Sequence, residues 1–328
     1  MRVVSTVTFR TEFDPIADVW SWAMSDAVPD VGTIRLADWD ADGHCLAVTN
    51  AGVFFWDGST WRSVAHAFDP SAAGFVRFVG LGRWLIGARD VWLYASGELS
   101  LLWTHPKQTL DCFDGTLDIG LAGGRNTRGA PVVRAHVQGR WLEALKLREL
   151  ASIKTVSRVD GDRWLVTGET IAGESYAALV EPLTQRMKRL AAPSIRAFVA
   201  SAGAVRLGVG CAVGFGGALL CDRVASAVES ADDPTAVTID SAGRVLVARG
   251  GRIWRRHGAP SPSWNVVWKD DGACAPIVAL SASARTIRAL TNGGAILEGH
   301  CLADIGEDDD VVTKPRIERE VTADASSA

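Results

Sequence analysis

The stretch Thr33–Trp61 reads TIRLADWDADGHCLAVTNAGVFFWDGSTW, and it decides the fold. Three short apolar runs, Thr33–Trp39, Cys45–Thr49 and Val53–Trp56, are separated by an Asp-Gly turn and an Asn-Ala-Gly turn, and a fourth run starts at Trp61. Short runs rich in Val, Ile, Phe and Trp that end at Asp, Asn or Gly are typical of antiparallel strands joined by tight hairpins. The stretch therefore predicts one small four-stranded sheet.

The second run of this unit recurs along the chain. Counterparts of the run at residue 45 lie at residues 84, 117, 164, 205, 245 and 287, so successive separations are 39, 33, 47, 41, 40 and 42 residues. A period near 40 residues is the length of a four-stranded propeller blade. We therefore expect an all-β fold, a single closed β-propeller of seven four-stranded blades.

The two ends of the repeat predict how the ring closes. The seventh unit has three apolar runs over 277–298 and no convincing fourth, whereas residues 1–10 form an orphan strand. Pairing the orphan with the incomplete unit would remove two open sheet edges. Within a propeller over 1–303, we expect 1–10 to be the closing strand, 11–32 a connector and 33–303 the blades. A polar, charged tail then follows over 304–328.

The sequence of the predicted hairpin Thr49–Gly58 resembles hairpins of Trp-rich bacterial β-propellers, which are distantly related to WD-repeat and Asp-box proteins. Asp57–Trp61 is similar to an Asp-box whose glycine comes one residue early. The Gly-His and Trp-Asp pairs of a true WD-repeat are not found at fixed offsets. The resemblance implies a fold, and propellers host lectins, hydrolases, lyases and scaffolds alike.

Composition narrows the functional classes. A net charge of −4 and a pI near 5.9 argue against general nucleic-acid binding. The amino terminus lacks a signal-like apolar core, and no stretch is long and apolar enough for a membrane-spanning helix. The six cysteines are scattered without metal-like spacing, which predicts reduced core residues. We expect a cytoplasmic protein without membrane contact.

Partner-binding candidates are residues outside the repeating core pattern. Most of the 13 tryptophans fall inside predicted strands, but Trp20 and Trp22 lie in the expected connector. Exposed aromatic residues on loops often anchor protein partners, although a connector packed against its own propeller would look the same. Arg125 and Arg128 mark a basic hairpin. The tail carries an acidic run of four residues, and both charged segments are also typical of solvated surface: Glu307, Asp308, Asp309 and Asp310.

A weak calcium motif is the one candidate metal site. Asp38, Asp40 and Asp42 have the D-x-D-x-D-G spacing of a hard-cation loop. Leu46 and Thr49 stand where further oxygen ligands would be needed, and the same residues make a good strand–turn–strand hairpin. The glycine-rich stretch 208–217 precedes another short strand and not a helix, so we expect no phosphate site and no cofactor.

No constellation for proton transfer or nucleophilic attack stands out in the sequence. We therefore expect a non-catalytic interaction platform that binds protein partners within a bacterial multiprotein assembly. A lectin-like or small-molecule-binding propeller is the first alternative. A hydrolase or lyase is the second, and it predicts acidic, Arg or His side chains that converge on the central channel.

Overall fold

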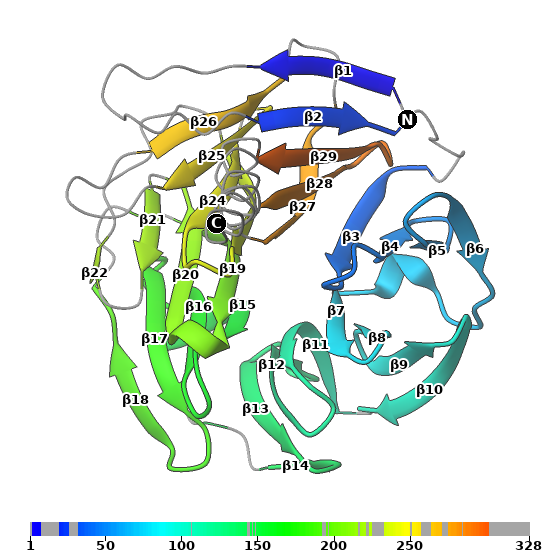
Figure 1. Cartoon of the computed structure of the whole chain (residues 1–328). Coiled ribbons are helices and arrows are strands. Elements are labelled where there is room, and N and C mark those ends of the chain that lie inside the picture. Colours follow the sequence, from blue (N-terminus) through cyan, green and yellow to red (C-terminus); the bar gives the residue numbers. More distant parts are fainter. Residues whose placement is uncertain are drawn as a thin grey trace, which may run out of the picture.

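The computed structural model places the chain in a ring of small antiparallel sheets (Figure 1). It describes residues 2–7, 20–25, 32–105, 107–142, 145, 147, 149–191, 195, 197–215, 217–220, 223–224, 233–249, 251–256, 264–270, 275–283 and 285–301. The helices within these residues are two three-residue 3-10 turns, Pro70–Ala72 and Val205–Leu207. Neither is long and apolar enough to span a membrane.

Six sheets have four strands each, in chain order from the centre of the ring outward. Blade 1 contains β3 (Ile34–Trp39), β4 (Cys45–Thr49), β5 (Val53–Trp56) and β6 (Trp61–Val64). Blade 2 contains β7 (Phe75–Gly80), β8 (Arg83–Gly87), β9 (Asp90–Ala95) and β10 (Glu98–Thr104). Blade 3 contains β11 (Gln108–Gly115), β12 (Ile119–Asn126), β13 (Pro131–Val137) and β14 (Arg140–Trp141).

The next three blades repeat this order. Blade 4 contains β15 (Leu150–Arg158), β16 (Trp164–Thr170), β17 (Ser175–Glu181) and β18 (Arg186–Arg189). Blade 5 contains β19 (Phe198–Ala204), β20 (Val209–Gly214), β21 (Gly217–Leu220) and β22 (Arg223–Val224). Blade 6 contains β23 (Pro234–Ile239), β24 (Val245–Arg249), β25 (Arg252–Arg256) and β26 (Trp264–Lys269). These sheets confirm the expected four-stranded blades.

The remaining sheet has five strands and joins the two ends of the described chain. From the rim inward these are β1 (Arg2–Val7), β2 (Trp20–Met24), β29 (Ile296–Cys301), β28 (Thr286–Thr291) and β27 (Ile277–Ala282). Direct pairing of residues 1–10 with the last strands is therefore not confirmed. β1 pairs with β2, and β2, from the expected connector, pairs with β29. The Trp-Ser-Trp sequence of β2 places two large rings on one face of the strand, toward the core.

The innermost strands contact one another in the cyclic order β3, β7, β11, β15, β19, β23, β27 and back to β3. Within each blade, antiparallel pairing sends the first–second and third–fourth turns to one side of the ring, which we call the hairpin face. Turns between second and third strands, and the segments that join successive sheets, lie on the opposite side, the linker face. Residues 40–44 belong to the hairpin face and residues 65–74 to the linker face.

One buried apolar cluster fills each interface between neighbouring sheets. In β4, Leu46 and Val48 pack toward blade 2 with Trp84, whereas Cys45 and Ala47 pack toward the five-stranded sheet. This division follows from the two-residue period of a strand, which turns successive side chains to opposite faces. All five residues of β4 are buried, because a second strand has a sheet neighbour on each side and a blade on each face.

Two expected second strands were misplaced. The expected strand near residue 117 begins at Ile119, after a turn held by Thr116, whose hydroxyl accepts from the backbone N–H of Ile119. The expected strand at residue 205 is a 3-10 turn that ends at Gly208 in the left-handed region, with φ 64°. The glycine-rich stretch covers β20 and leads into another short strand, β21, as predicted.

The cysteines within the described residues are core side chains. Cys45, Cys211 and Cys301 are buried, Cys112 is partly buried, and none of these four cysteines is in a disulfide bond. Burial raises the pKa of Cys112 to about 12, so its thiol is protonated at neutral pH.

Candidate functional site

A cavity of about 300 Å³ lies at the centre of the ring. It is lined by the innermost strands β3, β7, β19, β23 and β27, from Thr235 near the linker face to Ile239 near the hairpin face. The polar side chains of its wall are Asp38, Arg77, Ser201, Thr235, Thr238 and Ser281. An acidic and a basic side chain therefore meet in the channel, the kind of pairing that the hydrolase or lyase alternative predicts.

The charged side chains of the channel also join neighbouring blades. Asp38 of blade 1 accepts a 2.7 Å hydrogen bond from the backbone N–H of Phe78 in blade 2. Arg77, also in blade 2, donates through Nε and Nη2 to Oδ1 of Asp114 in blade 3, at 2.8 and 2.7 Å. Asp114 Oδ2 in turn accepts from the backbone N–H of Arg158 in blade 4, at 2.6 Å. These carboxylates work as links between innermost strands.

The chain of links extends to blade 5, where Ser157 and Ser201 share a 2.6 Å hydrogen bond between their hydroxyls. We call these contacts, from Asp38 to Ser201, the polar chain. Arg77 Nη1 lies 3.5 Å from Asp38, so one cation serves two carboxylates. Burial raises the pKa of Asp38 above its ordinary value, and Arg77 offsets only part of this effect.

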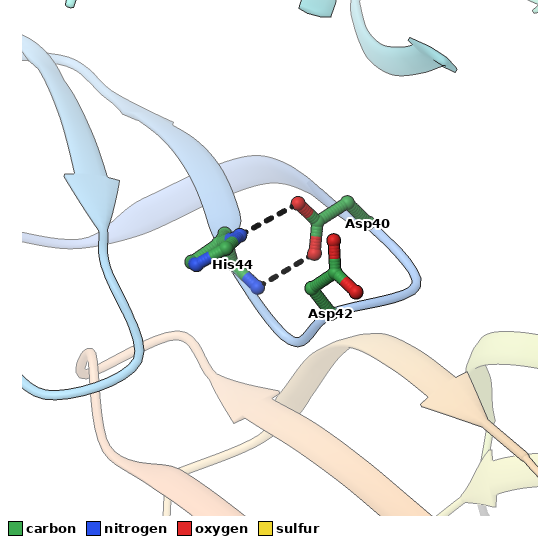
Figure 2. Close-up of side chains that lie close together, drawn as sticks. All are labelled: Asp40, Asp42 and His44. Atoms are coloured by element: carbon green, nitrogen blue, oxygen red, sulfur yellow. Dashed lines mark hydrogen bonds and ion pairs between the residues drawn. The ribbon is translucent and has the colours of Figure 1, made fainter. Parts of the chain in front are cut away.

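The expected calcium ligands are divided between two places. Asp38 belongs to the channel, whereas Asp40, Asp42 and His44 lie together in the β3–β4 turn, with ligand atoms within 4.8 Å of one another (Figure 2). Asp40 Oδ1 accepts from the backbone N–H of His44 at 2.7 Å, and Oδ2 contacts His44 Nδ1 at 2.8 Å. The carboxylate of Asp40 is thus already used in holding the turn.

The same turn chemistry recurs with arginine in place of histidine. In blade 4, Asp160 accepts from the backbone N–H of Arg163 and pairs with its Nε at 2.6 Å. In blade 6, Asp240 does the same with Arg244, again at 2.6 Å. Because a guanidinium takes the place of His44 in two other blades, the turn is explained as a hairpin motif without a metal ion. The hairpin alternative for Asp40 and Asp42 is the better account.

A second cavity, of about 380 Å³, opens on the linker face between blades 1 and 2. The rings of Phe68 and Trp92 stack in its wall, with centroids 5.5 Å apart. The exposed side chains of Arg89 and Asp90 also line it, as does Thr109 of blade 3. We call this cavity the linker-face cleft. It combines an aromatic wall with charges of both signs.

The predicted basic hairpin lies beside this cleft. Arg125 is the cross-strand partner of Thr109 in the β11–β12 ladder. Its Nε lies 3.0 Å from Oδ2 of Asp111, so its charge is paired within blade 3. Arg128 is exposed on the β12–β13 turn. Both predicted arginines are therefore on the surface of the linker face, and whether a partner contacts them stays a prediction.

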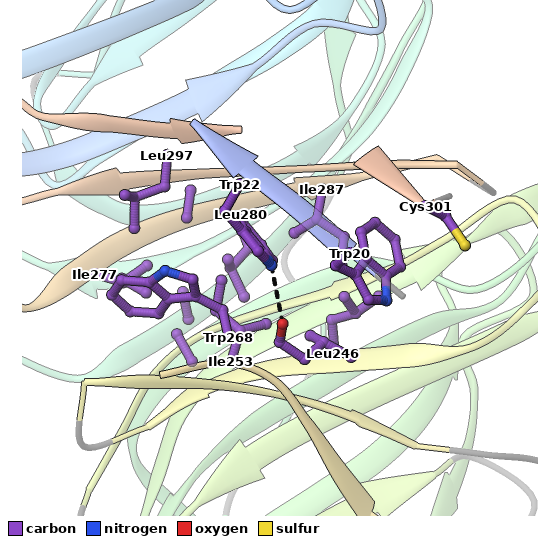
Figure 3. Close-up of a cluster of buried hydrophobic side chains, with 14 residues drawn as sticks. Trp20, Trp22, Leu246, Ile253, Trp268, Ile277, Leu280, Ile287, Leu297 and Cys301 are labelled. Atoms are coloured by element: carbon purple, nitrogen blue, oxygen red, sulfur yellow. Dashed lines mark hydrogen bonds between the residues drawn. The ribbon is translucent and has the colours of Figure 1, made fainter. Parts of the chain in front are cut away.

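Trp20 and Trp22 are not exposed anchors, which corrects the sequence-based expectation. Their side chains are only 2% and 1% exposed, because β2 is an internal strand of the five-stranded sheet. Trp22 Nε1 donates to the backbone carbonyl of Val267 in blade 6 at 3.0 Å (Figure 3). Its ring lies 6.2 Å from that of Trp268, and Arg255 packs over the ring of Trp20. Both tryptophans are structural.

Two further predictions concern individual segments. The acidic run Glu307, Asp308, Asp309 and Asp310 lies outside the described residues. The Asp-box-like turn is a structural hairpin turn: Asp57 Oδ1 accepts from the backbone N–H groups of Ser59 and Thr60 at 2.9 and 2.8 Å. These hydrogen bonds hold the pKa of Asp57 well below its ordinary value.

Solved structures with this arrangement of sheets are numerous. A virginiamycin B lyase from Staphylococcus aureus superposes with a TM-score of 0.64 at 8% identity, over 86% of this chain and 100% of that one. The chain has the β-propeller fold. The WD40 β-propeller domain of Doa1 gives 0.61 at 13% identity, over 84% and 95% of the two chains. A chain of the mitotic checkpoint complex gives 0.65 at 13%, over 92% and 98%.

No family model matches the sequence, and no curated protein matches it either. Identities of 8–13% establish the shared propeller fold and no shared activity.

Sequence reasoning missed the polar chain and the linker-face cleft. Asp38 was noticed for its spacing from Asp40, yet its partners Phe78 and Arg77 come from the next blade. The 40-residue offset between Asp38 and Phe78 equals about one repeat, which is the signal that a search for equivalent inner-strand positions could use. The cleft has no such signal, because its wall combines a linker, a turn and one residue of a third blade.

Proposed function

We propose that this β-propeller is a non-catalytic interaction platform that binds protein partners within a cytoplasmic assembly. The linker-face cleft is the observation that carries the proposal. Partner-binding surfaces concentrate their affinity in aromatic pockets with a charged rim. The stacked rings of Phe68 and Trp92, with Arg89 and Asp90 beside them, have that composition.

Two structural likenesses support this choice. One similar chain is the WD40 propeller domain of Doa1, and another belongs to an assembly, the mitotic checkpoint complex. Arg125 and Arg128 extend the proposed surface from the cleft across blade 3. In this proposal Arg128 supplies the exposed charge that selects an acidic rim on the partner.

The lyase likeness favours a second candidate, an enzyme whose site is the central channel. Asp38 and Arg77 would be its charged groups. We rank it second because the shortest contacts of both side chains already link neighbouring blades. A lectin-like surface has less support, because many of the large aromatic side chains, such as Trp84 and Trp164, are buried between blades.

We also propose to count the five-stranded sheet as the seventh blade, with β2 as its fourth strand and β1 as an addition at the rim. Support comes from β27, β28 and β29, which follow one another from the channel outward as the first three strands do in blades 1–6.

Affinity capture from the native cell tests the platform. The tagged wild-type chain is compared with Arg89→Glu and Trp92→Ala, and with Leu183→Ala as a matched control on the hairpin face, where Leu183 is 58% exposed. We expect a stoichiometric protein that is retained by the control and lost at least tenfold in both cleft variants. Equal recovery with all four chains would exclude the cleft as the binding surface. Failure to recover any stoichiometric protein would argue against a platform.

A further inference from the structure

One wall of the central cavity is lined by small residues. The other wall, from blades 1 and 2, carries Asp38 and Arg77. The residues of blades 5 and 6 and of the five-stranded sheet that line it include Ala200, Ala202, Gly203, Ala236, Ala279 and Ala282. At about 300 Å³, the space is at the lower end of the range of small-molecule sites.

The charged wall carries an excess of one negative charge. Asp38, Arg77 and Asp114 form a group of two carboxylates and one guanidinium. The short contacts of Arg77, at 2.7 and 2.8 Å, both go to Asp114, whose side chain is 8% exposed. Asp38 lies 3.5 Å from Arg77 Nη1 and is 20% exposed. The uncompensated charge therefore belongs to Asp38, the carboxylate that lines the cavity.

Within the described residues, one oxygen of Asp38, Oδ1, has no partner from another strand. The hydrogen bond from Phe78 and the contact with Arg77 both fall on Oδ2. Oδ1 has at most the neighbouring backbone N–H of Trp39, which interacts with this carboxylate. Burial also raises the pKa of Asp38, as expected for a carboxylate whose charge is only partly balanced. A cation in the cavity would complete that balance.

Hydroxyl groups on the facing strands add polar contacts at the other side of the space. Thr238 of β23 and Ser281 of β27 both line the cavity, while Ser201 is engaged with Ser157. Apart from Thr235, the remaining side chains of the lining are aliphatic or aromatic, with Phe78, Val237 and Leu280 among them. This combination suits a molecule with one charged nitrogen and an apolar body.

We propose that the central cavity binds a small organic amine as a monocation, with its ammonium group on Asp38 Oδ1 and its apolar body against the small-residue wall. This site is separate from the linker-face cleft and does not depend on the platform proposal. It assigns a ligand class to the channel without assigning a reaction.

Three small molecules of similar shape but different charge test the proposal by isothermal titration calorimetry. The probes are phenethylamine, its neutral counterpart 2-phenylethanol and the anionic phenylacetate. We expect phenethylamine to bind at least tenfold more tightly than either counterpart, because only the amine can pair with Asp38. Equal or weaker binding of phenethylamine, or no binding at all, would overturn the proposal.

Variants locate the bound probe. Asp38→Asn removes the charge but keeps an acceptor for the Phe78 N–H, and it should weaken phenethylamine binding at least tenfold. Ala202→Leu fills the cavity from a side chain that belongs to none of the buried apolar clusters, and it should abolish binding while the protein stays folded. Asp57→Asn is the matched control, because Asp57 lies on the hairpin face and its side chain is 17% exposed, close to the 20% of Asp38. Unchanged affinity in either channel variant would exclude this site.

Discussion

Two regions of the ring join neighbouring sheets in different ways. Along the channel from blade 1 to blade 5, the apolar clusters are supplemented by the polar chain. Between blade 6 and the five-stranded sheet, the cluster is large and rich in tryptophan, with Trp20, Trp22 and Trp268 in contact. The blades of the first region follow one another in sequence, whereas the second region brings residues near 20 beside residues near 300. The sheet that is assembled from both ends of the described chain is therefore held to blade 6 by this larger apolar cluster.

This difference has an energetic meaning. A buried ion pair fixes the relative position of its two side chains, but its attraction offsets little more than the cost of removing both charges from water. Removing one partner is destabilising, because it leaves a buried charge without a partner. Buried aromatic area contributes stability directly, because it is removed from water. The tryptophan-rich region should therefore account for more of the free energy of unfolding, and the polar chain for the fixed relative position of the innermost strands.

Removing Trp22 should have the largest effect. Trp22→Ala deletes a ring that is 1% exposed and also removes the hydrogen bond to Val267. We expect the free energy of unfolding to fall by about 3–5 kcal/mol, measured by urea denaturation. Leu183→Ala, at an exposed position, is the control and should change stability by less than about 0.5 kcal/mol. A loss below about 1 kcal/mol for Trp22→Ala would remove the energetic distinction between the two regions.

Breaking the polar chain should cost less. Asp114→Ala leaves both the Arg77 guanidinium and the Arg158 N–H without their acceptor. We expect a loss of about 2 kcal/mol in the same urea experiment. The double variant Arg77→Met/Asp114→Leu replaces both charges with apolar groups and should be more stable than Asp114→Ala. A double variant that is less stable than Asp114→Ala would mean that Arg77 contributes net stability through its two carboxylates, Asp38 and Asp114.

Gly299→Ala tests the tryptophan-rich region through the residue that packs against the Trp22 ring. A Cβ atom at Gly299 would lie 2.7 Å from ring atoms of Trp22, so the indole would have to move. Overpacking of this kind costs about 1–3 kcal/mol. In the Trp22→Ala background the clash is absent, and the penalty of Gly299→Ala should disappear. Additive losses in the double variant would show that the two positions are not coupled.

The smallest predicted effect is a pH dependence that arises in blade 3, outside the polar chain. His136 of blade 3 is fully buried, and its ring lies 4.5 Å from that of Trp103 and 5.1 Å from that of Trp141. Neither ring nitrogen has a hydrogen-bond partner within the described residues. Burial lowers the pKa of His136, and Asp118 offsets only part of this effect. Burial likewise lowers the pKa of the neighbouring His105; Arg134 adds to this effect, and Asp90 opposes it.

The sign of this dependence follows from linkage. Below the ordinary histidine pKa of about 6.5, the unfolded chain binds a proton that the folded chain resists. Stability is therefore fully present above about pH 6.5 and decreases as the pH falls below it. The urea midpoint of the wild type should decrease from pH 8 to pH 5, and His136→Phe should reduce that decrease. An unchanged pH profile in His136→Phe would exclude this histidine as a source of acid sensitivity.

The sequence was sufficient for the repeating parts of the fold. Alternating apolar residues and hairpin turns predicted blade 1 almost residue by residue, because those signals lie within about 30 neighbouring positions. The role of β2 could not be predicted in this way. Trp20 and Trp22 lie outside the repeat. The contacts of Trp22 with Val267 and Trp268 are set by tertiary packing alone.

The candidate sites were less predictable for the same reason. The spacing of Asp38 and Asp40 pointed to one loop, but their side chains lie on different elements of the architecture. Asp38 is at an inner-strand position, where its neighbours come from blade 2, and Asp40 is in a turn, where its partner His44 is four residues away. Sequence spacing predicts local partners well, whereas partners across a blade interface depend on how successive repeats align.

The pairing of β2 with β29 has a consequence for the way the protein folds. Trp20 and Cys301 are cross-strand neighbours separated by 281 positions, the difference between their residue numbers. Closing a loop of that length has a large entropic cost, so the pairing can form only after most of the intervening blades have condensed. During synthesis β2 leaves the ribosome before the blades that separate it from β29, so its two large indoles stay exposed until β29 has been made. Until then β2 has an unpaired strand edge, which can associate with other chains and lead to aggregation.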